Sequence, residues 1–289
     1  MNARTVEILD TTLRDGVQSA GVVFSLEDKI KLVRALDSLG VRYIEAGNPF
    51  SNPKDAELFR FARDKLKLKN ARLAAFGMTR RPGAAAEDDP GLRAILDSGA
   101  HIASIVGKSC AFQVREVLGK TLEENLRMIE DTVRSLTESG MAVFFDAEHF
   151  FDGYSDDPDY ALETLRAAER GGAERLVLCD TNGGTLPGAV AGAVKRAVAE
   201  FRTPIAIHCH NDAGLATAAT LLAVEAGAMQ VQGTINGYGE RCGNANLCEV
   251  IPNLELKMGL RALPEGSLPE LLSIARFISE LANLNMDEA

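Results

Sequence analysis

The stretch IAIHCHNDAGLATAATLLAVEAG, residues 205–227, carries the pattern from which the fold can be inferred. Its first six residues form a short apolar run with isoleucines at alternate positions, which predicts a buried strand. The segment 214–227 that follows predicts a helix, and Gly227 suits the residue that ends it. A strand followed directly by a helix is the repeating unit of parallel α/β folds.

The same unit recurs along the whole chain. Eight apolar segments predict strands, at 6–10, 43–47, 72–77, 101–107, 142–149, 175–180, 205–210 and 229–235. Amphipathic segments between them predict helices, at 27–39, 54–66, 121–139, 158–171, 188–201, 214–227 and 245–258, with a short helix after the loop 82–91. An open doubly wound sheet is the alternative, but eight evenly spaced units favour a closed (β/α)₈ TIM barrel.

Chain length agrees with one such barrel. The 289 residues suffice for a single barrel domain, which we expect over residues 1–260. Residues 261–289 are expected to form a C-terminal helical extension with one more helix at about 268–284. No second domain is expected after it.

Composition excludes several classes of function. The formal net charge of -10 and the pI of about 5.0 argue against partners that are nucleic acids or anionic membranes. No apolar run is long enough for a membrane span. The five cysteines are scattered without a CxxC pair, which indicates free thiols in a reducing compartment. We therefore expect a cytoplasmic protein.

Polar side chains gather where the predicted strands end. The active site of a TIM barrel lies at the C-terminal ends of its strands, so these side chains are the candidate functional residues. They come from six of the eight units, and they are Arg14, Asp15, Glu45, Glu148, Thr181, His208, His210 and Asn244.

His208 and His210 are two residues apart on a predicted strand, so their rings face the same side. With Asp15 from across the barrel mouth, the two imidazoles would form a site for one divalent metal ion. Mixed nitrogen and oxygen ligands suit Mg²⁺, Mn²⁺, Co²⁺ or Zn²⁺. The alternative interpretation is a pair of polar residues that merely cap the barrel.

The other candidates also have structural alternatives. Arg14 in TTLRD is either a surface ion-pairing residue or, beside a metal, a clamp for a substrate carboxylate. Glu148 is either a general acid or base at the mouth or half of a buried pair with His149. The glycine-rich GYGERCGN loop, 237–244, is either a tight turn or a shaped loop that turns Asn244 toward the metal.

Three motifs carry a resemblance to a known family. DTTLRDGVQS (10–19), HCHND (208–212) and GTINGYGERCGN (233–244) resemble the signatures of the metal-dependent acyl-CoA Claisen enzymes, and the likeness extends over residues 5–285. This family includes 2-isopropylmalate, homocitrate and citramalate synthases, with hydroxymethylglutaryl-CoA lyase as a cousin. Four further segments resemble the citramalate-forming branch, at 51–55, 120–129, 146–154 and 178–187.

The resemblance implies a reaction and a role for each candidate residue. Enzymes of that branch condense acetyl-CoA with pyruvate and hydrolyse the thioester to give (R)-citramalate, in isoleucine biosynthesis. Asp15, His208 and His210 would bind the divalent ion, with Asn244 as a further ligand. Arg14 and Thr181 would contact the substrate oxygens. Glu148 would be an acid or base, and Glu45 matches an acidic position shared across the superfamily.

Other functions stay open at the level of sequence. The 2-oxo acid would be 2-oxoisovalerate in a 2-isopropylmalate synthase or 2-oxoglutarate in a homocitrate synthase. A lyase is disfavoured, because Ile235 stands roughly where that branch has a catalytic cysteine. Members of this family type usually continue into a catalytic subdomain and a regulatory domain, often as homodimers. This chain ends before both, so we expect no feedback inhibition, and an idle barrel that binds metal and 2-oxo acid is a further alternative.

Overall fold

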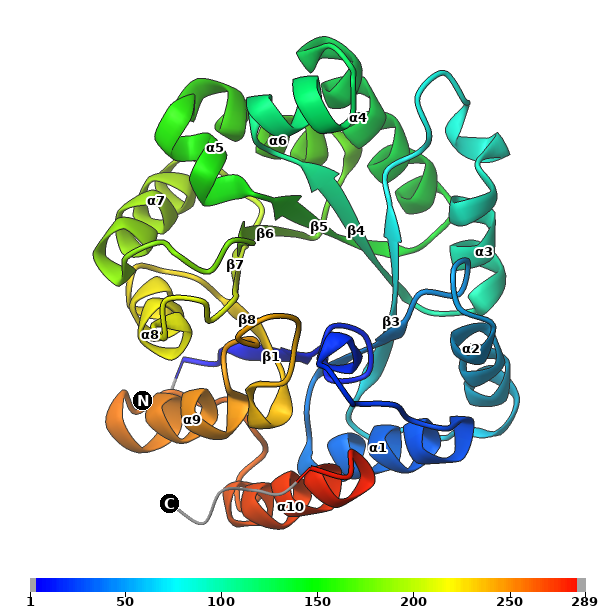
Figure 1. Ribbon diagram of the computed structural model, residues 1–289, viewed down its shortest axis with the longest axis vertical. Coiled ribbons are helices and arrows are strands. Elements are labelled where there is room, and N and C mark those ends of the chain that lie inside the picture. Colours follow the sequence, from blue (N-terminus) through cyan, green and yellow to red (C-terminus); the bar gives the residue numbers. More distant parts are fainter. Residues whose placement is uncertain (1–3, 285–289) are drawn as a thin grey trace.

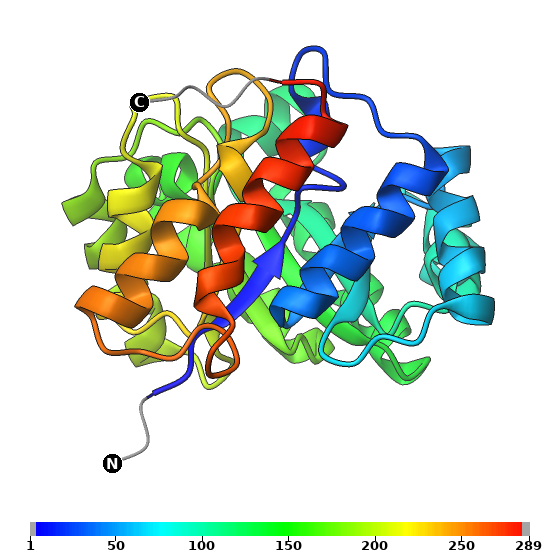
Figure 2. The same ribbon diagram turned by 90° about the horizontal axis from the view of Figure 1, so that it is seen from below.

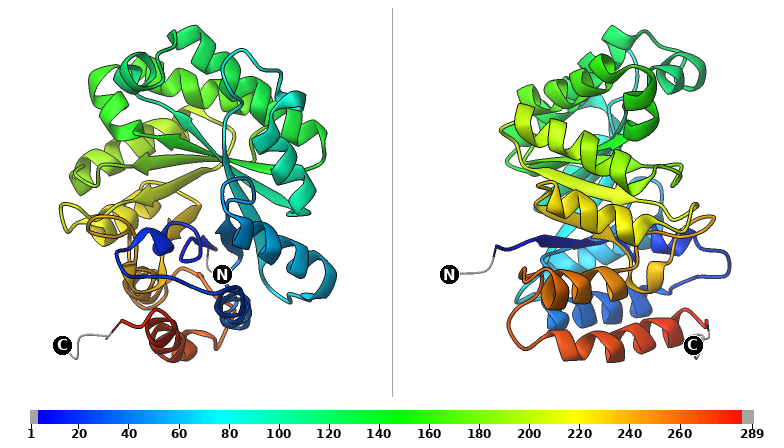
Figure 3. Two further views of the ribbon diagram at one scale, coloured as in Figure 1. Left: turned by 45° about the vertical axis from the view of Figure 1, so that its right-hand side comes forward. Right: turned by 90° about the vertical axis from the view of Figure 1, so that its left-hand side faces the viewer.

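The computed structural model describes residues 4–284, and the outermost residues of the two predicted domains, 1–3 and 285–289, lie outside the described residues. Eight parallel strands close into a barrel in the order β1 to β8, and helices surround it (Figure 1, Figure 3). The predicted TIM barrel is confirmed. The strands are β1 Glu7–Asp10, β2 Tyr43–Gly47, β3 Arg72–Met78, β4 Ile102–Lys108, β5 Ala142–Glu148, β6 Arg175–Asp180, β7 Ile205–Cys209 and β8 Gln230–Gly233.

The helices follow the predicted order. They are α1 Leu26–Leu39, α2 Pro53–Lys65, α3 Pro90–Ser98, α4 Leu122–Glu138, α5 Phe150–Asp156, α6 Pro158–Gly171, α7 Pro187–Glu200, α8 Ala216–Glu225, α9 Leu247–Pro252 and α10 Leu271–Leu281. Local sequence signals explain where helices begin, as at α1. The Ser25 hydroxyl accepts from the Asp28 amide while the Asp28 carboxylate accepts from the Ser25 amide, a capping box that begins α1.

Among the α-helices just named, α9 and α5 depart from the prediction. The helix predicted at 245–258 is α-helical only as far as Pro252, and residues 253–257 continue it as a π-helix. Pro252 has no amide hydrogen for the regular ladder, and the chain shifts to a wider bond from the Met258 amide to the Asn253 carbonyl. Helix α5 was not predicted, because seven residues are too few to show a helical period. It starts after His149, whose φ of 57° turns the chain sharply.

The barrel interior is packed in its lower part and polar at its mouth. A cluster of inward apolar side chains fills the lower part, and its members are Leu9, Tyr43, Ala74, Ile102, Phe144, Val177, Cys179 and Ala206. The rings of Tyr43 and Phe144 meet edge to face with centroids 5.1 Å apart. Below them, Arg175 closes the floor through an ion pair with Glu7 at 2.8 Å. Because the lower barrel is filled, only its upper end is free to form a site.

The C-terminal helix completes the ring of outer helices. Helix α10 lies between α9 and α1, on the side where β8 and β1 close the barrel (Figure 2). Its Ala275 carbonyl accepts a hydrogen bond of 2.9 Å from Asn236, in the loop after β8. A division at residue 260 stays a prediction. Among residues 4–284, no helix combines the length and apolarity that a membrane crossing requires.

A buried ion pair links the loops after β1 and β2. Lys29 Nζ lies 2.5 Å from Asp55 Oδ1 and 3.2 Å from the Leu13 carbonyl, and both charged side chains are almost fully buried. Asp55 Oδ2 also accepts from the Asn48 amide at 2.8 Å. Together these contacts hold α1, α2 and the first two loops at fixed positions.

We expect Lys29→Met to lower the free energy of unfolding by about 3–5 kcal/mol, because it leaves the Asp55 carboxylate buried without a cation. Urea unfolding followed by circular dichroism measures the change. Lys31→Met is the matched control on the same helix, since its partner Glu27 is exposed and its midpoint should stay nearly unchanged. Equal midpoints for the two variants would contradict the expectation.

Candidate active site

A cavity of about 580 Å³ opens at the C-terminal ends of the strands. Its volume lies in the usual range for small-molecule sites. Six of the eight predicted site residues line it, and these are Arg14, Asp15, Glu148, Thr181, His208 and His210. Its remaining lining includes a mainly apolar wall made of Phe76, Met78, Val106 and Cys179.

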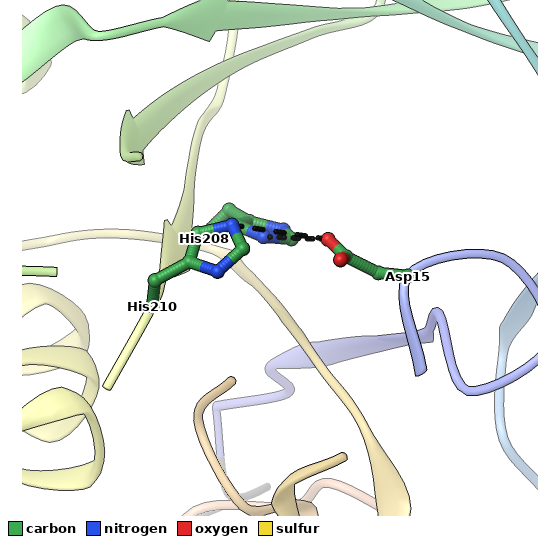
Figure 4. A group of neighbouring side chains, drawn as sticks. All are labelled: Asp15, His208 and His210. Carbon is green, nitrogen blue, oxygen red and sulfur yellow. Dashed lines mark ion pairs between the residues drawn. The ribbon is translucent and has the colours of Figure 1, made fainter. Parts of the chain in front are cut away.

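Asp15, His208 and His210 meet at the centre of the mouth (Figure 4). His208 Nε2 lies 3.3 Å and His210 Nε2 3.9 Å from the same oxygen, Asp15 Oδ2. His208 belongs to β7, His210 follows its end, and their ring centroids are 5.1 Å apart. The two-residue spacing therefore does place both imidazoles on one side. All three side chains are buried, and their ligand atoms lie close enough together to hold one metal ion.

The unsatisfied polar atoms of this cluster fit a cation. Asp15 Oδ1 and Asn244 Oδ1 are buried oxygens that have no hydrogen-bond partner among the described residues. Asn244 pairs with His210 through the backbone, and its Nδ2 donates to the Tyr238 carbonyl at 3.0 Å, so its oxygen is left over. Buried polar atoms without partners are costly, and electron-pair donors at one place are what a divalent ion requires.

The electrostatic surroundings favour an ionised Asp15 and a neutral His210, the forms in which both can bind a cation. Burial alone would raise the pKa of Asp15, but Arg14 and His208 outweigh it and hold that pKa well below its usual range. Burial and the neighbouring His208 lower the pKa of His210 to about 4, so its ring is neutral. Burial disfavours charge on His208 as well, yet its hydrogen bond with Asp15 raises the pKa. A bound cation would take the place of that shared proton.

Arg14 is fixed from two sides. Its Nε donates to Glu45 Oε2 at 2.6 Å, Nη1 lies 3.2 Å from Asp15 Oδ2, and the guanidinium stacks 4.1 Å from the centre of the Phe76 ring. Glu45 is fully buried and also accepts from the Thr11 hydroxyl at 2.5 Å. Glu45 is not part of the cavity lining. The geometry therefore gives it contact with Arg14 and Thr11 beneath the site.

Glu148 and Thr181 line the other side of the cavity. Glu148 forms an ion pair of 2.6 Å with Lys108, at the end of the neighbouring strand β4. The alternative pairing with His149 is wrong, because His149 Nδ1 lies 3.0 Å from Asp152 instead. Thr181 Oγ1 accepts from the His149 amide at 2.8 Å, so its hydroxyl hydrogen can be donated into the cavity.

The loop after β8 makes a tight turn, and this turn holds the Asn244 side chain in place. Residues Gly237, Arg241 and Gly243 all have positive φ angles. A side chain at Gly239 would approach Asn244 Nδ2 to 2.2 Å, so only glycine leaves Asn244 in place. The Ser19 hydroxyl both donates to the Gly239 carbonyl and accepts from its amide, at 2.8 and 2.7 Å. These two hydrogen bonds join the motif at 10–19 to the motif at 233–244.

Arg241 ties three strand-end loops together. Its guanidinium pairs with both oxygens of Asp212 at 2.8 and 3.1 Å and donates to the Thr181 carbonyl at 2.7 Å. It also pairs with Glu240, the partner expected from a salt-bridged turn. Arg241 thus holds Thr181 and Asp212 against the loop after β8.

Sequence reasoning did not assign a role to several inward-facing residues. Asp146 lines the cavity, and burial together with Glu45 raises its pKa to about 7. Gln232 lies inside the barrel beside His208, and Lys108 reaches Glu148. Alternation along a strand was the available signal for Asp146, because it lies two residues before Glu148 and so shares its face.

Comparison with known protein families matches residues 5–278 to the HMGL-like family. A curated (R)-citramalate synthase of Aquifex aeolicus is 50% identical over 283 residues, which cover 98% of this chain and 53% of that protein. A probable 2-isopropylmalate synthase of Methanosarcina acetivorans is 35% identical, over 90% of this chain and 48% of that protein. The chain spans about half the length of these curated relatives.

A solved structure supports the fold independently. The HMG-CoA lyase of Bacillus subtilis superposes with a TM-score of 0.82 at 23% identity, covering 100% of this chain and 97% of that one. At this identity the likeness concerns the fold alone. The family match, by contrast, extends over nearly the whole sequence and includes all three motifs. The chain belongs to the HMGL-like family.

Proposed function

We propose that this chain carries the site for condensation of acetyl-CoA with pyruvate, followed by hydrolysis of the thioester to (R)-citramalate. One observation carries the proposal: a buried cluster of Asp15, His208 and His210 that fits a metal ion, directly beside Arg14 in an open cavity. The 50% identity to a curated (R)-citramalate synthase supports the choice of reaction.

The metal would be held by Asp15, His208 and His210, with Asn244 Oδ1 as a further ligand. When bound, a divalent ion at this place supplies Lewis-acid polarisation of the keto group of the 2-oxo acid. The mixed nitrogen and oxygen donor set suits Mg²⁺, Mn²⁺, Co²⁺ or Zn²⁺. Glu45 and Phe76 are not ligands in this arrangement, and they orient Arg14.

The chain's own residues position the substrate and stabilise developing charge. The Arg14 guanidinium donates to the keto oxygen of pyruvate and stabilises the negative charge that grows there. Its fixed position means that little reorganisation is needed during the reaction. The Thr181 hydroxyl donates to the pyruvate carboxylate from the opposite side of the cavity.

Glu148 is the proposed base. Its carboxylate takes a proton from the methyl group of the acetyl thioester, and the carbanion equivalent adds to the polarised keto carbon. Lys108, 2.6 Å away, holds the Glu148 carboxylate in position before the transfer. Afterwards the same carboxyl group can return that proton to the alkoxide oxygen formed from the keto group. Water then adds to the thioester carbonyl, the carbon–sulfur bond breaks, and CoA leaves as the thiol with a proton from that water.

Selection of pyruvate would come from the apolar wall of Phe76, Met78, Val106 and Cys179. Each methylene that such a wall accepts or rejects is worth about 1–3 kcal/mol. Identity is 50% to the citramalate synthase and 35% to the probable 2-isopropylmalate synthase, which favours pyruvate over 2-oxoisovalerate. 2-Oxoglutarate would bring a second carboxylate to this wall, and burying it there without a cation is costly.

Two alternatives of a different kind have less support. For a lyase, Ile235 is the relevant position, and it is fully buried with its amide bonded to the Thr12 hydroxyl at 2.9 Å. An apolar side chain there supplies no acid. For an idle barrel, binding would occur without turnover, which rate measurements distinguish. We further propose a cytoplasmic protein, supported by five unpaired cysteines, and a homodimer on family grounds.

We expect His208→Ala and Asp15→Ala each to weaken Mn²⁺-dependent pyruvate binding by at least about 100-fold, because each removes one ligand of a three-residue cluster. Titration calorimetry with Mn²⁺, and again after chelation with EDTA, measures the effect. His101→Ala is the control, since His101 is exposed and precedes β4 at the opposite end of the barrel. Undiminished binding in both site variants would rule out the assigned metal cluster.

With Mn²⁺ present, pyruvate should bind at least about tenfold more tightly than 2-oxoisovalerate, because the two additional methyl groups of the larger acid would overlap the apolar wall beside the substrate. Both acids are titrated into the same preparation of the unaltered chain. Chelation should abolish binding of either. A reversed preference would assign the site to 2-isopropylmalate synthesis, and no binding of either acid would contradict the proposal.

A further inference from the structure

We propose that Gln232 is a positioning residue that fixes the protonated nitrogen of His208, so that His208 presents Nε2 to the metal. The inference rests on the proposed metal site and concerns how one of its ligands is oriented. Gln232 belongs to none of the roles discussed above.

The contact is direct and completely buried. Gln232 Oε1 lies 3.0 Å from His208 Nδ1, and Gln232 is fully buried. The two residues are partners in the register of the neighbouring strands β7 and β8, which holds their side chains side by side on the inner face. An amide oxygen only accepts hydrogen bonds, so the hydrogen of this bond belongs to His208 Nδ1.

A second contact sets which end of the amide faces His208. Gln232 Nε2 donates to Asp146 Oδ1 at 3.4 Å, and the other Asp146 oxygen accepts from the Ser104 hydroxyl at 3.1 Å. Because the carboxylate accepts at that end, the NH₂ group turns toward Asp146 and the oxygen turns toward His208. The chain of contacts runs from β4 and β5 across the barrel to β8 and β7.

The consequence for the metal site follows from imidazole chemistry. A ring that keeps its hydrogen on Nδ1 has its available electron pair on Nε2, and Nε2 is the atom 3.3 Å from Asp15. Hydrogen bonds of this kind orient metal-binding histidines and make them better donors. His210 differs, because its Nδ1 has no partner in the described part of the chain. Of the two histidines, His208 is therefore the one whose ring orientation is fixed, and Gln232 fixes it.

Calorimetric titration of the chain with Mn²⁺ alone tests the proposal without reference to turnover. Gln232→Leu removes the acceptor at similar volume and should weaken Mn²⁺ binding by about 10–100-fold. Gln230→Leu is the matched control. Gln230 is equally buried, lies two residues earlier on the same strand, and makes no side-chain hydrogen bond in the described structure. Its affinity should stay within about threefold of the original.

The position of the hydrogen is a readout that a purely structural role would not move. In Zn²⁺-loaded protein labelled with ¹⁵N-histidine, His208 should show a protected Nδ1 hydrogen, and only four histidines need assignment. The signal should disappear in Gln232→Leu and persist in Gln230→Leu. Gln232→Glu keeps an acceptor oxygen and should keep the signal, which shows that any loss is not due to unfolding.

The outcomes separate this inference from the proposed function. Unchanged Mn²⁺ affinity in Gln232→Leu, or a hydrogen on Nε2 rather than Nδ1 of His208, would overturn the role of Gln232 while the metal site stands. A failure of the unaltered chain to bind Mn²⁺ would overturn the metal site and this inference together. Weakened binding in Gln230→Leu as large as in Gln232→Leu would also overturn it.

Discussion

The buried carboxylate of Asp15 is the group on which the mouth of this barrel depends. It lies 3.2 Å from Arg14 and 3.3 Å from His208, in surroundings where an unpaired charge would be very costly. Arg14 is itself held by Glu45. The Glu45 carboxylate therefore anchors the Arg14 guanidinium, and the Asp15 carboxylate is shared between that guanidinium and the histidines. The positive charge of Arg14 therefore stays in one place. The negative charge of Asp15, which would be available to a metal ion, stays beside it.

Closure of the barrel is what brings these groups together. The Asp15 loop follows the first strand, and the histidines lie at the end of the seventh and just after it. They face each other because β1 pairs with β8. Two sets of hydrogen bonds hold the loops at the barrel mouth together. Ser19 holds Gly239 through both backbone groups, and Arg241 joins the loops after β6, β7 and β8.

Much of the fold and the common face of the two histidines could be predicted from the sequence, because both depend on local periodicity. The strand–helix repeat gave the barrel, and the spacing of His208 and His210 gave their common face. The partners of Glu148 and His208 could not be predicted in this way. The Lys108–Glu148 and Gln232–His208 contacts depend on how adjacent strands are aligned, and a shift of one residue would exchange the faces. Helix α5 escaped notice because the turn at His149 has no local marker.

The cavity of about 580 Å³ has a further implication for selectivity. It is far larger than pyruvate, since the proposed reaction also requires room for the end of a thioester. Total volume therefore cannot distinguish one small 2-oxo acid from another. In the proposed arrangement, Arg14 and the metal ligands would hold the polar groups of the substrate from one side and Thr181 from the other, so its carbon chain has one direction left. Under the proposed function, discrimination then depends on where that direction meets the apolar wall of Phe76, Met78, Val106 and Cys179. A change there would alter substrate choice without disturbing the cluster of Asp15, His208 and His210.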